Sequence, residues 1–226
     1  MQNLNTYNNF YFVGIGGIGM SALARYFHAA GKNVLGYDKT ETKLTTELQN
    51  EGISISFEDV VDEKFSELNK ENTLVIYTPA IKVLGILDYF NQNGFEVLKR
   101  AKVLGLITEN TECISVAGTH GKTTTSSLVA HLCKVANLPF SGFLGGISEN
   151  YKSNFIYNGT EMSVLEADEY DRSFLNLSPD WAIVTSIDAD HLDIYGDTET
   201  IEQGFRDFAD LVPENNQLFV RKGVKI

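Results

Sequence analysis

The segment from Cys113 to Thr125 constrains the fold most, because it joins a strand pattern to a helix pattern through a glycine turn. It reads Cys-Ile-Ser-Val-Ala-Gly-Thr-His-Gly-Lys-Thr-Thr-Thr, and apolar residues then recur at helical spacing (Leu128, Val129, Leu132, Val135). In such a strand–turn–helix unit, backbone N–H groups at the start of the helix point at bound phosphate groups. The segment therefore predicts an α/β domain that binds a nucleotide at this turn.

The residue types in this turn are those that a triphosphate and its metal ion require. The Lys122 ammonium can reach the outer phosphate oxygens, and the Thr123 hydroxyl can ligate Mg²⁺. The expected nucleotide-binding residues are Gly118, Thr119, His120, Gly121, Lys122, Thr123 and Thr124. The full phosphate-loop pattern has an earlier glycine at the position where this chain has Val116. An ordinary strand-to-helix turn without a ligand is therefore the alternative.

A second glycine turn lies near the start of the chain, between a buried strand pattern at 10–13 and a helix pattern. Gly14, Gly16 and Gly19 fit the spacing G-x-G-x-x-G, and Asp38 ends the next predicted strand. This arrangement holds a diphosphate at the helix start and a ribose hydroxyl at the acid. It fits a UDP-sugar as well as it fits NAD. The alternatives are a tight turn that binds nothing and, for Asp38, a solvated acid at the strand end.

Apolar runs and helical patterns alternate along the chain, which predicts two α/β domains. The first, residues 1–108, is expected to be a Rossmann-like domain with a parallel sheet. Its predicted strands lie at 10–13, 33–38, 53–57, 73–77 and 96–98, and its helices near 20–27, 42–50 and 86–93. The second, residues 109–226, is expected to be a P-loop ATPase-type α/β domain. Its predicted strands lie at 113–117, 162–165, 181–185 and 217–220, with a glycine-rich turn at 142–146 and a helix near 200–211.

Acidic residues follow two of the strands predicted in the second domain. The run from Glu166 to Asp171 follows one strand, and the run from Asp188 to Asp193 follows the next. Open α/β sheets bind ligands at the carboxyl ends of their strands, so both runs are expected near the nucleotide turn. We expect at least one member of each run to bind Mg²⁺, and His191 to take part with them. A solvated loop is the alternative for either run.

Composition limits the class of partner and the compartment. The net charge of −12 argues against a nucleic-acid surface, because phosphate backbones are bound by clustered Lys and Arg. The polar N-terminus predicts no signal peptide, and no run approaches the roughly 18 apolar residues of a membrane span. Cys113 and Cys133 lack a metal-type spacing and are expected to be reduced and buried. We therefore expect a cytoplasmic protein without nucleic-acid or membrane partners.

Four motifs together resemble those of the Mur ligase family, which makes peptidoglycan precursors. They are Gly14–Ser21, Ala117–Thr125, Glu166–Phe174 and Asp190–Asp193, and they occur in the family's order. The family's phosphate loop has the shorter form Gly-Thr-x-Gly-Lys-Thr, which accounts for Val116. The resemblance implies an ATP-dependent ligase that joins UDP-N-acetylmuramate to L-alanine through an acyl phosphate. The nearest alternative is the member that recycles the murein tripeptide onto the same substrate, and a more distant one is a non-catalytic NAD-binding regulatory module.

The resemblance also implies roles for individual residues, with ATP and Mg²⁺ as cofactors. Lys122, Glu166 and His191 would be catalytic, and Thr123, Glu166 and His191 would be the metal ligands. The residues that would face the UDP part of the substrate are Gly14, Gly16, Gly17, Gly19, Asp38 and Thr78, with Arg100 a weaker candidate. Gly145 and Gly146 would either let the backbone approach the sugar or form a plain turn.

The chain is shorter than members of this family, which end in a third, Rossmann-like domain. We therefore expect an N-terminal domain followed by an interrupted central domain. Such a fragment would be inactive or nearly inactive alone but able to bind the UDP substrate. An unpaired strand at the cut edge leaves self-association into a homodimer open.

Overall fold

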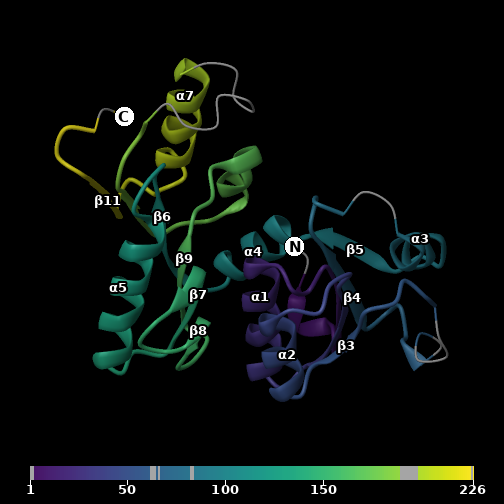
Figure 1. The fold of residues 1–226 in the computed structure, drawn as a ribbon. Helices are drawn as coiled ribbons and strands as arrows, with labels where there is room; N and C mark the ends of the chain where they lie inside the picture. Colours follow the sequence, from purple (N-terminus) through teal and green to yellow (C-terminus); the bar gives the residue numbers. More distant parts are fainter. Residues whose placement is uncertain (1–2, 62–64, 66, 82–83, 189–197, 225) are drawn as a thin grey trace. The chain divides into compact units, whose positions relative to one another are not determined.

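A computed structural model describes residues 3–61, 65, 67–81, 84–188, 198–224 and 226 (Figure 1). Backbone contacts divide the chain into two compact units, Met1–Val103 and Leu104–Ile226. Each unit contains its own sheet and its own helices, which confirms the predicted α/β class.

The first unit is built on a five-stranded sheet in which every strand pairing is parallel. Its order is β3-β2-β1-β4-β5. The strands are β1 (Asn9–Val13), β2 (Asn33–Tyr37), β3 (Ser54–Ser56), β4 (Thr73–Tyr77) and β5 (Glu96–Lys99). A short 3-10 helix, η1 (Leu4–Thr6), precedes them. This is the Rossmann-like parallel sheet that the alternating patterns predict.

Helices cover both faces of the first sheet. They are α1 (Ile18–Ala29), α2 (Lys43–Asn50) and α3 (Gly85–Gln92), and α4 (Arg100–Thr108) spans the boundary between the units. Phe10 of β1 stacks on Phe27 of α1 with ring centroids 3.7 Å apart. The next residue, Tyr11, lies 4.8 Å from Phe90 of α3. Because successive strand residues point to opposite faces, α1 and α3 lie on opposite faces of the sheet.

The second unit contains a six-stranded mixed sheet in the order β11-β10-β6-β9-β7-β8. Its strands are β6 (Glu112–Ala117), β7 (Phe140–Ser148), β8 (Ser153–Tyr157), β9 (Met162–Glu166), β10 (Trp181–Val184) and β11 (Gln217–Val220). Among the strand pairs that the structure describes in this sheet, only β7 and β8 run antiparallel to each other. The sequence patterns predicted four of these strands and missed the β7–β8 hairpin.

The predicted glycine-rich turn at 142–146 is wrong, since these residues lie inside β7. The glycines are there because neighbouring groups approach the strand closely. A Cβ on Gly142 would lie 3.3 Å from the Cβ of Ala130, and one on Gly145 would lie 2.5 Å from a Glu166 oxygen. Glycine inside a strand commonly marks such a close approach rather than a turn.

Two helical segments and α5 complete the second unit. α5 (Lys122–Val135) packs on β7 and β9 through a buried cluster of Ala130, Cys133, Phe140, Leu144, Ile156 and Val164. The 3-10 helix η3 (Tyr170–Asn176) packs on α7 (Thr198–Ala209), where Phe174 stacks on Phe208 at 5.1 Å. Both cysteines are buried and form no disulfide, as expected. Among the described residues, no helix is both long and apolar enough to cross a bilayer.

Candidate functional site

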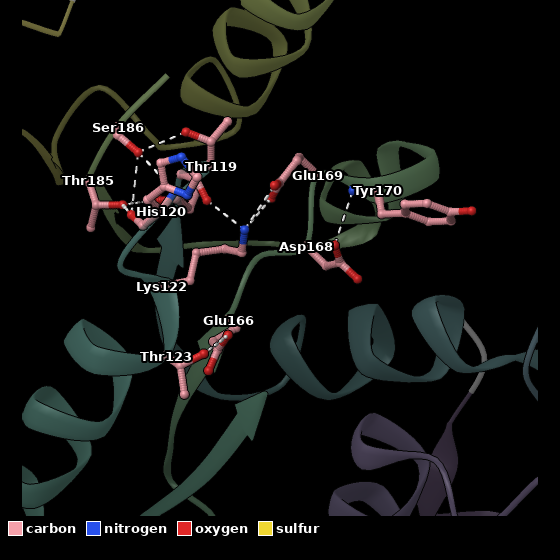
Figure 2. A network of polar contacts seen from close by, with 12 residues as sticks. Thr119, His120, Lys122, Thr123, Glu166, Asp168, Glu169, Tyr170, Thr185 and Ser186 are labelled. Atoms are coloured by element: carbon pink, nitrogen blue, oxygen red, sulfur yellow. Dashed lines mark hydrogen bonds and ion pairs between the residues drawn. The ribbon is translucent and has the colours of Figure 1, made fainter. Parts of the chain in front are cut away.

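Three neighbouring parallel strands of the second sheet end at the same edge. β6 lies between β10 and β9, with Ala117 opposite Val184 and Val116 opposite Glu166. The residues after these strands therefore meet there: the turn Gly118–Gly121, the segment after β9 and the segment after β10. Figure 2 shows this group of polar side chains. The crossover of parallel strands thus brings the glycine turn and the first acidic run together, as the sequence predicts.

The turn between β6 and α5 requires glycine at two positions. Gly118 has a φ of 135°, and Gly121, the N-cap of α5, has a φ of 85°. A Cβ on Gly118 would collide with the Thr185 hydroxyl and would lie 2.9 Å from the Ser186 backbone nitrogen. Gly118 therefore leaves room for the segment after β10, which a side chain would displace. Gly121 adopts the backbone conformation with which α5 begins.

The segment after β10 holds this turn in place. The Thr185 hydroxyl donates to the His120 carbonyl at 2.6 Å, and the His120 N–H donates to the Ser186 hydroxyl at 2.9 Å. Thr119 bonds the same segment, with its N–H 3.1 Å from the Ser186 carbonyl. Thr185 and Ser186 were not predicted from the sequence. Thr185 ends the predicted strand at 181–185 and Ser186 follows it, and this position at the sheet edge was the signal that could have identified them.

Lys122, the first residue of α5, is bound within the protein. Its ammonium donates to the Gly118 carbonyl at 2.6 Å and lies 2.8 Å from each carboxylate oxygen of Glu169. Glu169 is 2% exposed, so this is a buried ion pair (Figure 2). Glu169 stands in the first acidic run, but no motif singled it out.

Glu166, at the end of β9, is held by three hydrogen-bond donors. The Gly145 N–H donates to Oε1 at 2.6 Å, and the Ser126 hydroxyl donates to the same oxygen at 3.0 Å. The Thr123 hydroxyl donates to Oε2 at 3.1 Å. Because these donors come from α5 and β7, the carboxylate is fixed relative to the start of α5. Ser126, which is buried inside α5, is a further residue that the motifs did not reveal.

The paired oxygens of Thr123 and Glu166 fit the requirements of Mg²⁺. This ion takes oxygen ligands, often one or two carboxylates together with substrate phosphates and water. Within the described residues, no three His, Cys, Asp or Glu side chains gather as a metal site made of protein alone would require. Metal binding here would therefore need further oxygen ligands, such as those of a phosphate group or water.

The other residues expected near the turn do not all lie against it. Asp188 does, with Oδ2 3.2 Å from the Thr119 hydroxyl. Thr124 is exposed on the first turn of α5. The Asp168 carboxylate accepts from the Tyr170 N–H at 3.1 Å, and both side chains point away from Lys122 in Figure 2. His191 lies outside the described residues.

In the first unit, the glycine turn after β1 is closed by Asp38. The Gly16 N–H donates to one Asp38 oxygen at 2.7 Å, and the Thr40 N–H donates to the other at 3.1 Å. A Cβ on Gly16 would lie 2.8 Å from that carboxylate. Asp38 therefore orders the glycine turn itself, a use that the dinucleotide pattern did not suggest.

The remaining candidates in this unit surround the same turn. A Cβ on Gly14 would lie 2.9 Å from Thr78 Cγ2, and one on Gly19 would lie 2.7 Å from Arg100 Nη1. Gly17 is the N-cap of α1. The pKa of Tyr37 is raised, mainly by burial and to a smaller extent by the negative charges of Asp59 and Asp38. The structure thus gathers Gly14, Gly16, Gly19, Asp38, Thr78 and Arg100 around one helix start.

Comparison with known proteins gives matches over nearly the whole chain. Residues 9–111 match the description "Mur ligase family, catalytic domain", and residues 116–223 match "Mur ligase middle domain". The chain is 55% identical over 226 residues to a UDP-N-acetylmuramate–L-alanine ligase of Flavobacterium psychrophilum, covering 100% of this chain and 50% of that protein. It is 51% identical over 230 residues to the ligase of the same name from Christiangramia forsetii, covering 100% and 51%.

A solved structure gives the same result. The crystal structure of UDP-N-acetylmuramate-alanine ligase from Thermotoga maritima superposes with a TM-score of 0.80 at 30% identity. The match covers 96% of this chain and 49% of that one. The chain therefore spans about half the length of the relatives that it matches.

Proposed function

The chain belongs to the Mur ligase family, and on this premise we propose that it supplies the ATP site and the UDP-substrate site of a UDP-N-acetylmuramate–L-alanine ligase. The second unit binds ATP at the turn 118–121, and the first unit binds the UDP part of the substrate at the turn 14–19. The product is a peptidoglycan precursor, made in the cytoplasm.

One observation carries this proposal. At a single sheet edge, the start of α5 presents the Lys122 ammonium and the Thr123 hydroxyl, and the Glu166 carboxylate lies 3.1 Å from that hydroxyl. Backbone N–H groups of a helix start, an ammonium and a carboxylate–hydroxyl pair are the elements that hold a triphosphate with its metal. An ordinary strand-to-helix turn has no need of the buried charges gathered here.

The reaction proceeds in two steps. A carboxylate oxygen of UDP-N-acetylmuramate attacks the γ-phosphorus of ATP, the bond to the β-phosphate oxygen breaks, and an acyl phosphate and ADP result. The amino group of L-alanine then attacks the acyl carbon, phosphate leaves, and the nitrogen loses a proton to give the amide. Neither step changes an oxidation state, so no oxidant or reductant is needed.

The first step brings an anionic carboxylate to an anionic triphosphate, so the main requirement is electrostatic. Lys122 and the N–H groups at the start of α5 lie where charge develops on the phosphate oxygens. Thr123 and Glu166 would hold Mg²⁺, which supplies charge neutralisation at the phosphates when bound. His191 is proposed as a further metal ligand on the motif alone.

The first unit is proposed to bind the UDP part because its glycine turn is preformed. Asp38 fixes the Gly16 N–H at 2.7 Å, and α1 begins immediately after the turn. A helix start of this kind favours a diphosphate. Gly14, Gly17, Gly19 and Thr78 surround this position and are proposed to contact the substrate.

L-Alanine is preferred to the murein tripeptide as the amino substrate. The curated relatives at 51% and 55% identity are named as alanine ligases, and no observation favours the recycling reaction. A non-catalytic NAD-binding module would have no use for the buried ion pair at the turn 118–121.

A thermal-unfolding panel tests the binding part of the proposal. UDP-N-acetylmuramate, Mg²⁺-ATP and NADH are added separately to the chain. A ligand at 100 times its Kd should stabilise the folded state by about 2.7 kcal/mol. UDP-N-acetylmuramate and Mg²⁺-ATP should each raise the midpoint, and NADH should not. Stabilisation by NADH alone would contradict the proposal.

An activity assay then separates the two ligases. A polypeptide of the relatives' full length that carries this sequence is assayed for phosphate release with L-alanine or with the tripeptide. Release that depends on ATP, UDP-N-acetylmuramate and L-alanine is expected. Release with the tripeptide but not with L-alanine would identify the recycling reaction instead.

A further inference from the structure

We propose that Glu169 makes the phosphate turn selective for a nucleotide that carries a divalent metal ion, by cancelling the positive charge of Lys122. The inference rests on the proposed ATP site and assigns a task to a residue that the motifs left without one. Its consequence is that the site excludes metal-free nucleotide.

The charge cancellation follows from the geometry of the pair. Both carboxylate oxygens of Glu169 lie 2.8 Å from Lys122 Nζ. The side chains are 18% and 3% exposed for Lys122 and Glu169, respectively. Water screens such a buried pair poorly, so the two charges offset each other strongly.

The Lys122 ammonium is fully hydrogen-bonded within the protein. It has three N–H donors, and it donates to the Gly118 carbonyl at 2.6 Å and to both oxygens of Glu169 at 2.8 Å. A phosphate oxygen can therefore accept from it only by replacing one of these partners, and the carboxylate beside it offsets the charge that would attract the phosphate.

Other carboxylates border the same turn. Glu166 lies 3.1 Å from the Thr123 hydroxyl, and Asp188 lies 3.2 Å from the Thr119 hydroxyl. Among the described residues at this turn, these two carboxylates and Glu169 outnumber the Lys122 ammonium, so their charges oppose a polyanion. The helix start contributes only a partial positive charge of about half a unit.

A free triphosphate would therefore meet net repulsion at this turn, whereas its metal complex brings part of the neutralising charge with it. The Thr123–Glu166 oxygen pair would hold that metal beside the phosphates. Glu169 acts one step removed, through Lys122, and is a positioning residue rather than a catalytic one.

Equilibrium dialysis of the chain with radiolabelled ATP tests the inference, once in Mg²⁺ and once in EDTA. The wild-type chain should bind ATP in Mg²⁺ and bind it far more weakly in EDTA. Glu169→Gln should raise the affinity in EDTA about tenfold, because one buried negative charge is removed beside the ammonium. The matched control is Glu161→Gln, an exposed glutamate just before the opposite end of β9, which should leave the affinity in EDTA unchanged. A rise of less than threefold in Glu169→Gln would overturn the inference.

A measurement on the wild-type chain keeps the test decisive if Glu169→Gln does not fold. Salt screens the interaction between charges, so a site that repels free ATP should bind it no more weakly in EDTA when NaCl is raised from about 0.05 M to about 0.5 M. An affinity in EDTA that falls steeply over this range would show that the turn attracts free ATP in spite of Glu169, and would overturn the inference.

The results also separate this inference from the proposed function. If the wild-type chain binds ATP equally in Mg²⁺ and in EDTA, the charge-cancelling task of Glu169 is wrong and the ATP site stands. If the wild-type chain binds no ATP in either buffer, the proposed nucleotide site is wrong, and the inference falls with it.

Discussion

Replacement of Gly145 by alanine should disable the proposed metal site while leaving the fold intact. Gly145 lies in β7, and its N–H donates to Glu166 Oε1 at 2.6 Å. An alanine Cβ would lie 2.5 Å from Glu166 Oε2 and 2.9 Å from its Cδ. Ordinary van der Waals contact begins near 3.4 Å, so the carboxylate must move by about 0.9 Å.

The expected size of the effect follows from this displacement. A misplacement of about 1 Å in a catalytic arrangement can cost roughly 100-fold in rate. Loss of a hydrogen bond to a charged acceptor costs about 1.5–3 kcal/mol at most, and the added methyl group offsets part of this by stiffening the unfolded chain. Gly145→Ala should therefore lower turnover roughly 100-fold, yet lower the free energy of unfolding by less than about 2 kcal/mol.

The neighbouring glycine provides the matched control. A Cβ on Gly146 would lie 3.3 Å from the Thr123 methyl group and would contact no carboxylate. Gly146→Ala should change turnover by less than about threefold, since only a few tenths of an ångström must be absorbed. The assay is ATP-dependent phosphate release by a full-length polypeptide, with urea unfolding in parallel. Wild-type turnover in Gly145→Ala would refute the placement of Glu166 at the reacting phosphates.

Three further perturbations test other parts of the structure. Gly118→Ala should lower the free energy of unfolding by roughly 2 kcal/mol, because its φ of 135° and its contact with Thr185 both oppose a side chain; unchanged stability in urea would contradict this. Asp38→Ala should lower the free energy of unfolding in urea by about 1–3 kcal/mol without any ligand, because the Gly16 and Thr40 N–H groups lose their acceptor. An unchanged free energy of unfolding would identify Asp38 as a solvated acid at the strand end. Burial raises the pKa of Cys113 from 9.0 to about 11, so the unfolded state ionises first and the free energy of unfolding should fall as the pH rises from 9 toward 11. Cys113→Ala should show a smaller fall over this range, and an equal fall would exclude Cys113 as its source.

The parallel strands were predictable because most of them are short apolar runs bounded by turn residues. The run at 73–77 is β4 itself, and the runs at 162–165 and 181–185 match β9 and β10 to within one residue at each end. The order of strand, turn and acid along the chain was enough to place Lys122, Thr123 and Glu166 at one edge. Right-handed parallel crossovers leave little freedom in where such segments end.

The missed features depend on contacts between segments that are distant in sequence. Gly142 and Gly145 resemble a turn because their role in β7 is set by Ala130 and by Glu166. In the sequence, Glu169 is one more acid in the run 166–171. The structure shows that, among the ion pairs of the described residues, it is the acid of this run that pairs with the Lys122 ammonium. A local pattern carries no information on such pairings, so only the fold reveals them.

A crystal structure of the chain with Mg²⁺ and a non-hydrolysable ATP analogue would show where the nucleotide binds. The β- and γ-phosphates should lie against the backbone N–H groups of residues 118–123. The metal ion should contact the Thr123 hydroxyl and the Glu166 carboxylate, directly or through water, with Lys122 still beside Glu169. A nucleotide bound elsewhere, with no phosphate at the start of α5, would contradict the proposed site.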